Sequence, residues 1–110
     1  MYKILLVLLF LVATSDLLTA QSQRLTTFVD ANGARGDHFG ANVDLEKDFV
    51  IIGAPRAMYQ GKAGGGKAIV YERFGATNRW IQRPDLEKED NFQNDEFGFA
   101  VQIDGDYAFV

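Results

Sequence analysis

The chain has 110 residues, of which 47% are hydrophobic and 24% charged, the proportions of a folded protein rather than a disordered one. Its net charge of −4 argues against nucleic acid or an anionic membrane surface as a partner, because both attract clustered Lys and Arg. The absence of cysteine excludes disulfides and cysteine-based metal clusters. No asparagine begins an Asn-x-Ser/Thr sequence, so we expect no N-glycan.

Residues 1–20 have the features of a secretory signal peptide. Lys3 supplies a positive start, residues 4–12 form an unbroken apolar run, and small residues follow. This order of charge, apolar run and small residues is typical of a cleaved leader, and we expect it to form a signal helix. A membrane-spanning helix would need ~20 mostly apolar residues. Asp16 interrupts the apolar run before that length is reached.

Cleavage is predicted between Ala20 and Gln21, with cleavage after Ser15 as the alternative. Either site implies a secreted or cell-surface protein with no membrane span in this segment. The polar residues 21–35 that follow are interpreted as a lead-in segment. Within it, the apolar side chains of residues 25–29 are compatible with a short strand that pairs elsewhere in the fold.

From residue 36 onward the sequence predicts an all-β fold. Apolar and polar residues alternate over 41–45, as in a half-buried strand. Residues 49–52 are a continuous apolar run, as in a strand buried on both faces, and Pro55 ends it. Two further strands are predicted at 68–74 and 79–82. Short strands bounded by turns indicate a sandwich, a barrel or a propeller.

A stretch of the sequence is repeated 58 residues later, so that Phe39 corresponds to Phe97. The four residues 37–40 (DHFG) correspond to 95–98 (DEFG), and the hydrophobic pattern that follows continues in register to the last residue. In the second copy, Asp104-Gly105 is a strong signal for a two-residue hairpin turn. The repeat predicts that the same strand–turn–strand unit begins again.

The sequence FGANVDLEKDFVIIGAP at residues 39–55 resembles an FG-GAP repeat, the blade unit of integrin α-chain-type β-propellers, and its continuation resembles the secreted, non-integrin branch. The resemblance implies antiparallel four-stranded β-propeller blades, the first at 36–94 and the start of a second at 95–110. The motif residues, all expected to be structural, are Phe39, Gly40, Gly53, Ala54, Pro55, Phe97 and Gly98.

About one and a half blades are therefore expected, whereas a propeller has ~4–8. We expect the remaining blades of the same chain to lie beyond Val110 and to close the fold. The alternative is a small free-standing β-sandwich, which would leave residues 107–110 as an exposed apolar edge.

No catalytic, cofactor-binding or metal-binding residue is predicted. Residues 61–68 (GKAGGGKA) fit a phosphate loop up to Lys67, but Ala68 replaces the Ser or Thr that holds magnesium, and a strand follows instead of a helix. Residues 85–96 place carboxylates at several positions of a calcium loop, but Asp90 replaces its glycine. We interpret them as a solvated acidic loop, with weak calcium binding as a minority alternative. His38 is the single histidine, which argues against zinc.

The resemblance implies an extracellular interaction or adhesion module that binds a protein or glycan ligand, with no catalysis in these residues. The alternative is an accessory propeller of a secreted hydrolase or other enzyme whose active site lies beyond Val110. A cell-surface array of such blades is a third possibility.

Overall fold

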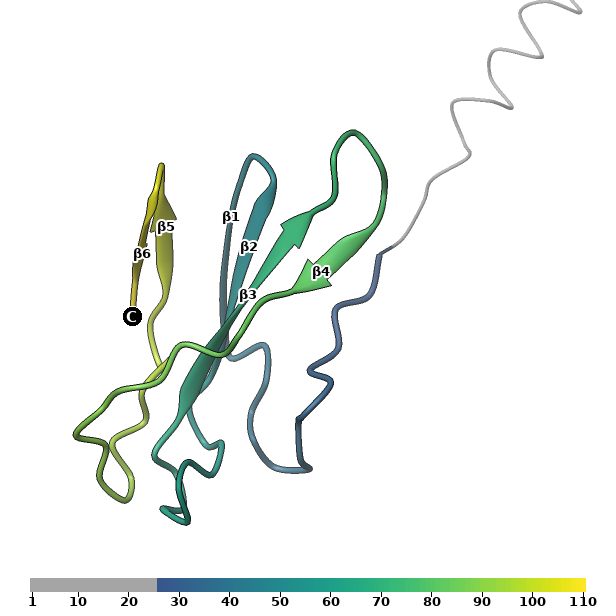
Figure 1. Cartoon of the computed structure of the whole chain (residues 1–110). Helices are drawn as coiled ribbons and strands as arrows, with labels where there is room; N and C mark the ends of the chain where they lie inside the picture. Colours follow the sequence, from purple (N-terminus) through teal and green to yellow (C-terminus); the bar gives the residue numbers. More distant parts are fainter. Residues whose placement is uncertain (1–25) are drawn as a thin grey trace, which may run out of the picture.

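The computed structural model describes residues 26–110, so the predicted signal peptide and its cleavage sites lie outside the described residues. A four-stranded antiparallel sheet contains β1 (Asn42–Glu46), β2 (Phe49–Ala54), β3 (Lys67–Arg73) and β4 (Trp80–Gln82), in that order (Figure 1). A separate hairpin contains β5 (Gln102–Asp104) and β6 (Tyr107–Phe109). The described residues contain strands and no helix, which confirms the all-β prediction. Within them, no helix is long and apolar enough to span a membrane.

The strands follow the predicted segments with small shifts at their ends. β2 continues past residue 52 through Gly53 and Ala54, because both residues still pair with β3. The turn predicted at Asp104-Gly105 is displaced by one residue. Asp104 is the last residue of β5 and pairs with Tyr107, which leaves Gly105 and its successor as the two turn residues.

The hairpin β5–β6 repeats β1–β2 in the same register. In the first hairpin Leu45 lies opposite Val50, and 58 residues later Ile103 lies opposite Ala108. The backbone angles repeat as well, since the turn residue Lys47 and its counterpart 58 residues on both have positive φ, 51° and 56°. The structure thus confirms the 58-residue offset.

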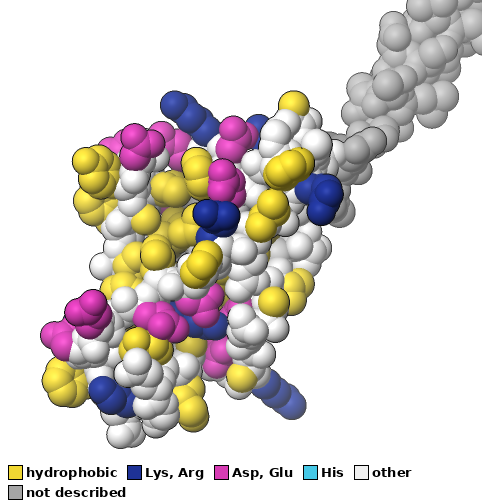
Figure 2. All heavy atoms as spheres, in the orientation of Figure 1, with side chains coloured by type: hydrophobic (Ala, Val, Ile, Leu, Met, Phe, Trp, Pro, Cys, Tyr) yellow, Lys and Arg dark blue, Asp and Glu magenta, His cyan; other side chains and the backbone are white. Residues whose placement is uncertain are grey.

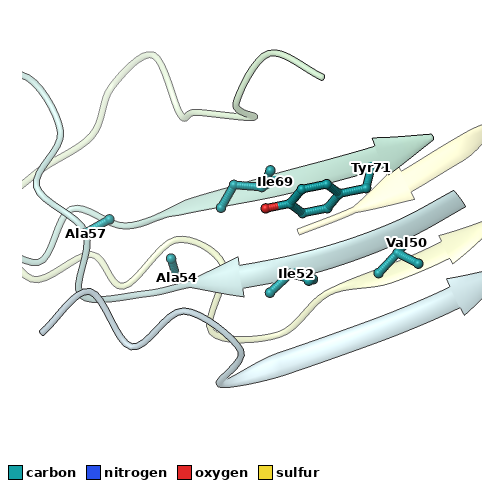
Figure 3. Packing of buried hydrophobic residues seen from close by; sticks show 6 residues of the cluster. All are labelled: Val50, Ile52, Ala54, Ala57, Ile69 and Tyr71. Carbon is teal, nitrogen blue, oxygen red and sulfur yellow. The ribbon is translucent and has the colours of Figure 1, made fainter. Parts of the chain in front are cut away.

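One face of the sheet, here called the lead-in face, is covered in part by residues 26–40. Figure 3 shows the buried hydrophobic residues of this face, which are Val50, Ile52, Ala54, Ala57, Ile69 and Tyr71. The ring of Phe28 packs on them, 5.0 Å from the ring of Tyr71 and 5.2 Å from that of Trp80. The described part of residues 25–29 forms no strand, so the strand predicted there is wrong for residues 26–29. This segment is held by aromatic packing instead.

The opposite face, the hairpin face, is covered by the second repeat. Ile51 of β2 and Ala68 of β3 are fully buried there, and Ile103 of β5 packs on them. Figure 1 shows β5–β6 on one side of the sheet and the lead-in residues on the other, and Figure 2 shows hydrophobic side chains between the hairpin and the sheet. The central strands are therefore buried from both sides, as the continuous apolar run of β2 predicts.

Candidate functional site at the junction between the repeats

The two FG corners, residues 39–40 and 97–98, have the same backbone shape and different surroundings. Gly40 and Gly98 both have φ of +91°, a left-handed value that glycine adopts without steric cost. A Cβ on Gly98 would overlap the carbonyl oxygen of Lys67, whereas a Cβ on Gly40 would meet nothing within 4 Å. The second corner is thus closed against the first repeat, and the first corner is open.

The glycine of the GAP sequence lies between the two corners. The N–H of Gly40 donates a hydrogen bond to the carbonyl of Gly53 at 3.0 Å, within the first repeat. On its other side, a Cβ on Gly53 would overlap the carbonyl oxygen of Gly98 in the second repeat. Ala54 and Pro55 follow, both buried. The motif residues of the two repeats therefore meet, backbone against backbone, at one end of the sheet.

Side chains of β1 fasten the second hairpin to the first repeat. The carboxylate of Asp44 accepts a hydrogen bond of 2.8 Å from the N–H of Ile103, and that of Glu46 accepts one of 3.0 Å from the N–H of Gly105. The side-chain amide of Asn42 donates to the carbonyl of Phe99 at 3.3 Å. Bonds from backbone N–H groups to carboxylates are charge-assisted, so these contacts fix the register between repeats as well as adding stability.

The glycine-rich loop at residues 61–66 forms hydrogen bonds with the residues around the second FG corner. Its carbonyls accept hydrogen bonds of 3.0 Å from the N–H groups of Asn94, Glu96 and Phe97. A phosphate site would need the opposite polarity, with backbone N–H groups directed at the ligand. The loop therefore connects strands and supports the second FG corner.

Lys67, the residue at the phosphate-binding position of that loop, is buried in an ion pair. Its ammonium lies 2.7 Å from a carboxylate oxygen of Asp30 and 3.0 Å from one of Asp85, and only 8% of its side chain is exposed. Burial raises the pKa of Asp30, but hydrogen bonds from Lys67, from the backbone of Asn32 and from Gln82 outweigh it and hold the pKa below its ordinary value. Burial and the same two carboxylates together raise the pKa of Tyr71 to about 12.

The acidic loop at 85–96 does not gather its carboxylates. Asp85 pairs with Lys67, Glu96 pairs with Arg56 at 3.4 Å, and Asp95 pairs with Lys88. Within residues 26–110, no three His, Cys, Asp or Glu side chains are grouped so that they could hold a metal ion. Asp85 and Glu96, at the two ends of the suggested calcium loop, are thus paired with different cationic side chains.

A cleft of about 220 Å³ opens where the two FG corners come together. It is lined by His38, Ala41, Asn42, Pro55, Arg56, Glu96 and Phe99. The pair of Arg56 and Glu96 spans the two repeats across it, with 53% and 36% of the side chains exposed. Phe99 is 67% exposed. Sequence reasoning named Pro55 as a motif residue and His38 as the single histidine, but it placed neither in a cleft. It missed the other lining residues, because only the junction brings them together and no short motif links them.

Comparison with known protein families identifies the first of the two repeats. Residues 21–71 match the model of a family described as FG-GAP repeat, and this match contains the first FG corner, the GAP sequence, β1, β2 and most of β3. No curated protein and no solved structure matches the chain significantly.

Proposed function

Since this chain is an FG-GAP repeat protein, we propose that it acts as an extracellular binding module whose ligand, a protein or a glycan, occupies the cleft between the two FG corners. The single observation that carries the proposal is this cleft, where charged, amide and aromatic side chains from two repeats converge. The signal-peptide pattern of residues 1–20 supports the extracellular location.

The chemistry of the cleft fits recognition of a polar ligand. An exposed ion pair such as Arg56–Glu96 contributes little to stability, so both groups remain able to exchange their mutual contact for contacts with a ligand. The planar guanidinium of Arg56 suits carboxylates and vicinal hydroxyls. The exposed ring of Phe99 offers an apolar platform beside them.

A catalytic role is not part of the proposal. Residues 26–110 contain no serine or cysteine, so His38 has no hydroxyl of Ser or thiol of Cys to activate within the described residues. The adhesion role and the alternative role as an accessory propeller of a secreted enzyme both use the same cleft for binding.

The test is binding of the secreted chain to an array of glycans and extracellular-matrix proteins, with Arg56→Ala as the variant. Arg83→Ala is the matched control, because Arg83 forms a comparable exposed pair with Glu72 outside the cleft. We expect a ligand whose binding weakens at least ~10-fold in Arg56→Ala, the value of one lost charged hydrogen bond, and stays unchanged in the control. Absence of any ligand, or equal binding by both variants, would contradict the proposal.

Secretion is tested separately, by expressing the full chain in a secreting host and sequencing the product from its N-terminus. We expect the mature chain to begin at Gln21. A product that stays in the cell with Met1 intact would overturn the extracellular assignment.

A further inference from the structure

Residues 35–37 form the tripeptide Arg-Gly-Asp, which precedes His38 and lines no part of the cleft. The N–H of Asp37 donates to the carbonyl of Ala34 at 3.3 Å, so Arg35 and Gly36 are the two central residues of a β-turn. Gly36 has φ of +91°, the positive value that a type II turn requires at its third residue, and a Cβ there would meet nothing within 4 Å. Both central residues are exposed, so the turn lies at the surface.

The two charged side chains of the tripeptide offer two different contacts to one partner. A guanidinium forms paired hydrogen bonds with a carboxylate. A carboxylate oxygen is a ligand for Mg²⁺ or Ca²⁺. A receptor that carries a carboxylate and its own bound divalent cation can therefore recognise both ends of the tripeptide, and the glycine between them lets its backbone approach closely.

In the folded chain the carboxylate of Asp37 is withheld from such a partner. Only 9% of Asp37 is exposed, whereas residues 31–36 are all exposed. Its carboxylate accepts a hydrogen bond of 2.8 Å from the N–H of Ala34, and its carbonyl accepts one of 3.0 Å from the N–H of Arg56. The aspartate thus closes the turn that contains it, and only the arginine of the tripeptide is accessible.

The second repeat has the same closed turn without the Arg-Gly pair. Asp95, 58 residues after Asp37, accepts a hydrogen bond of 2.9 Å from the N–H of Phe92. The N–H of Asp95 donates to the carbonyl of Phe92 at 3.2 Å. The residues before this aspartate are Gln93 and Asn94. Closure by the aspartate is therefore a feature of both repeats, whereas the full tripeptide occurs only in the first.

We propose that Arg35-Gly36-Asp37 is a masked binding site for a receptor that offers a carboxylate to Arg35 and a bound divalent cation to Asp37. The hydrogen bond from Ala34 to the carboxylate of Asp37 is the mask. An exposed turn with few buried contacts opens at a low cost in free energy, and opening frees the carboxylate to turn outward beside the guanidinium. The site does not depend on the ligand cleft, because Arg56 contributes only its backbone N–H to the turn.

The experiment is surface plasmon resonance on the secreted full chain in the presence of Mg²⁺, with the ectodomain of an integrin that binds Arg-Gly-Asp peptides as the probe. Ala34→Pro removes the N–H that the carboxylate of Asp37 accepts. Phe92→Pro is the matched control, because it removes the equivalent N–H in the second repeat, where no Arg-Gly pair precedes the aspartate. We expect Ala34→Pro to bind at least ~10-fold more tightly than wild type, the effect of one charged hydrogen bond that no longer has to be broken. Phe92→Pro should bind as weakly as wild type.

Two further variants keep the test decisive. Ala34→Pro/Asp37→Glu moves the carboxylate outward by one methylene group and should lose the gained binding. If circular dichroism shows that Ala34→Pro does not fold, insertion of two glycines between Ala34 and Arg35 replaces it, because this insertion moves the N–H of Ala34 away from Asp37 within exposed residues. Wild type that binds as tightly as the opened variant would show that the turn is no mask. A folded, opened variant that gains no binding, or a gain that survives Asp37→Glu, would show that the tripeptide is no binding site, and each of these results would overturn the proposal.

Discussion

The two FG corners of this chain differ in what lies against them, although their backbones are the same. Gly98 is buried against the carbonyl of Lys67, and Ile103, which follows it in the chain, is 8% exposed. A Cβ on Gly40 would meet open space, and Leu45, which follows Gly40 in the chain, is 63% exposed. Each repeat therefore contains only half of its own packing surface. Burial at one corner is supplied by the preceding repeat, in the way that stacked repeats share a core.

The largest loss of stability is expected when the ion pair between Lys67 and Asp30, which holds the lead-in segment to the sheet, is broken. Lys67→Met should lower the free energy of unfolding by about 3–5 kcal/mol, because it leaves Asp30 as a buried charge without its main partner. Chemical denaturation measures the change. Lys88→Met is the control, since Lys88 forms exposed pairs, and a similar loss in both variants would show that burial of the Lys67 pair is unimportant.

A smaller loss of stability is expected from truncating Ile103, and almost none from truncating Leu45, its equivalent in the first repeat. Ile103→Ala should cost about 2–5 kcal/mol, because it opens a cavity between β5 and the sheet. Leu45→Ala, at the same position of the first repeat, should change stability by less than ~0.5 kcal/mol in the monomer. If chemical denaturation shows equal losses of stability for the two variants, Ile103 is no more important to packing than Leu45, which would contradict the difference between the two corners.

The two corner glycines give a finer comparison. Gly40→Ala and Gly98→Ala impose the same left-handed strain, since both residues have φ of +91°. Gly98→Ala should cost a further ~1–3 kcal/mol, because its Cβ must displace the backbone of Lys67. Thermal melting of both variants measures this difference directly. If the two melting temperatures agree, the close contact at the second corner is not what requires glycine.

The smallest effect is a dependence of stability on pH. The pKa of Asp30 is lower in the folded chain, so the carboxylate contributes stability above its unfolded pKa of ~3.9 and loses it as the pH falls through the folded value. We expect wild type to lose more stability than Asp30→Asn between neutral pH and about pH 3. Parallel acid titrations followed by circular dichroism measure this, and superimposable curves would contradict it.

Much of the fold could be predicted from residues that act locally. Alternation and apolar runs located the strands, and the 58-residue offset predicted the second hairpin in the correct register. The turn at Gly105 was misplaced by one residue, because the sequence of a hairpin turn does not say where pairing stops. The sequence did not reveal the partners of Asp44 and Glu46, whose side chains bond to residues 59 positions away.

The candidate site was less predictable than the fold. The absence of a phosphate loop followed from Ala68 and the strand after it, and the structure adds that Lys67 is buried in an ion pair. The cleft between Arg56 and Glu96 could not be foreseen, because those residues meet only when two repeats pack. The repeat offset predicts that the two repeats have the same strands, but it does not predict how one repeat packs against the next, and the cleft depends on that packing.

Hydrogen exchange at single amides tests the difference between the two corners most directly. The amides of Phe97 and Ile103 should exchange slowly, since they donate to Gly65 and Asp44 in the first repeat. The equivalent amide of Leu45 donates only an exposed hydrogen bond, to the carboxylate of its neighbour Asp44 in the same repeat, so this amide and that of Phe39 should exchange much faster. Equal rates for the two sets would contradict the claim that a repeat becomes complete only against its neighbour.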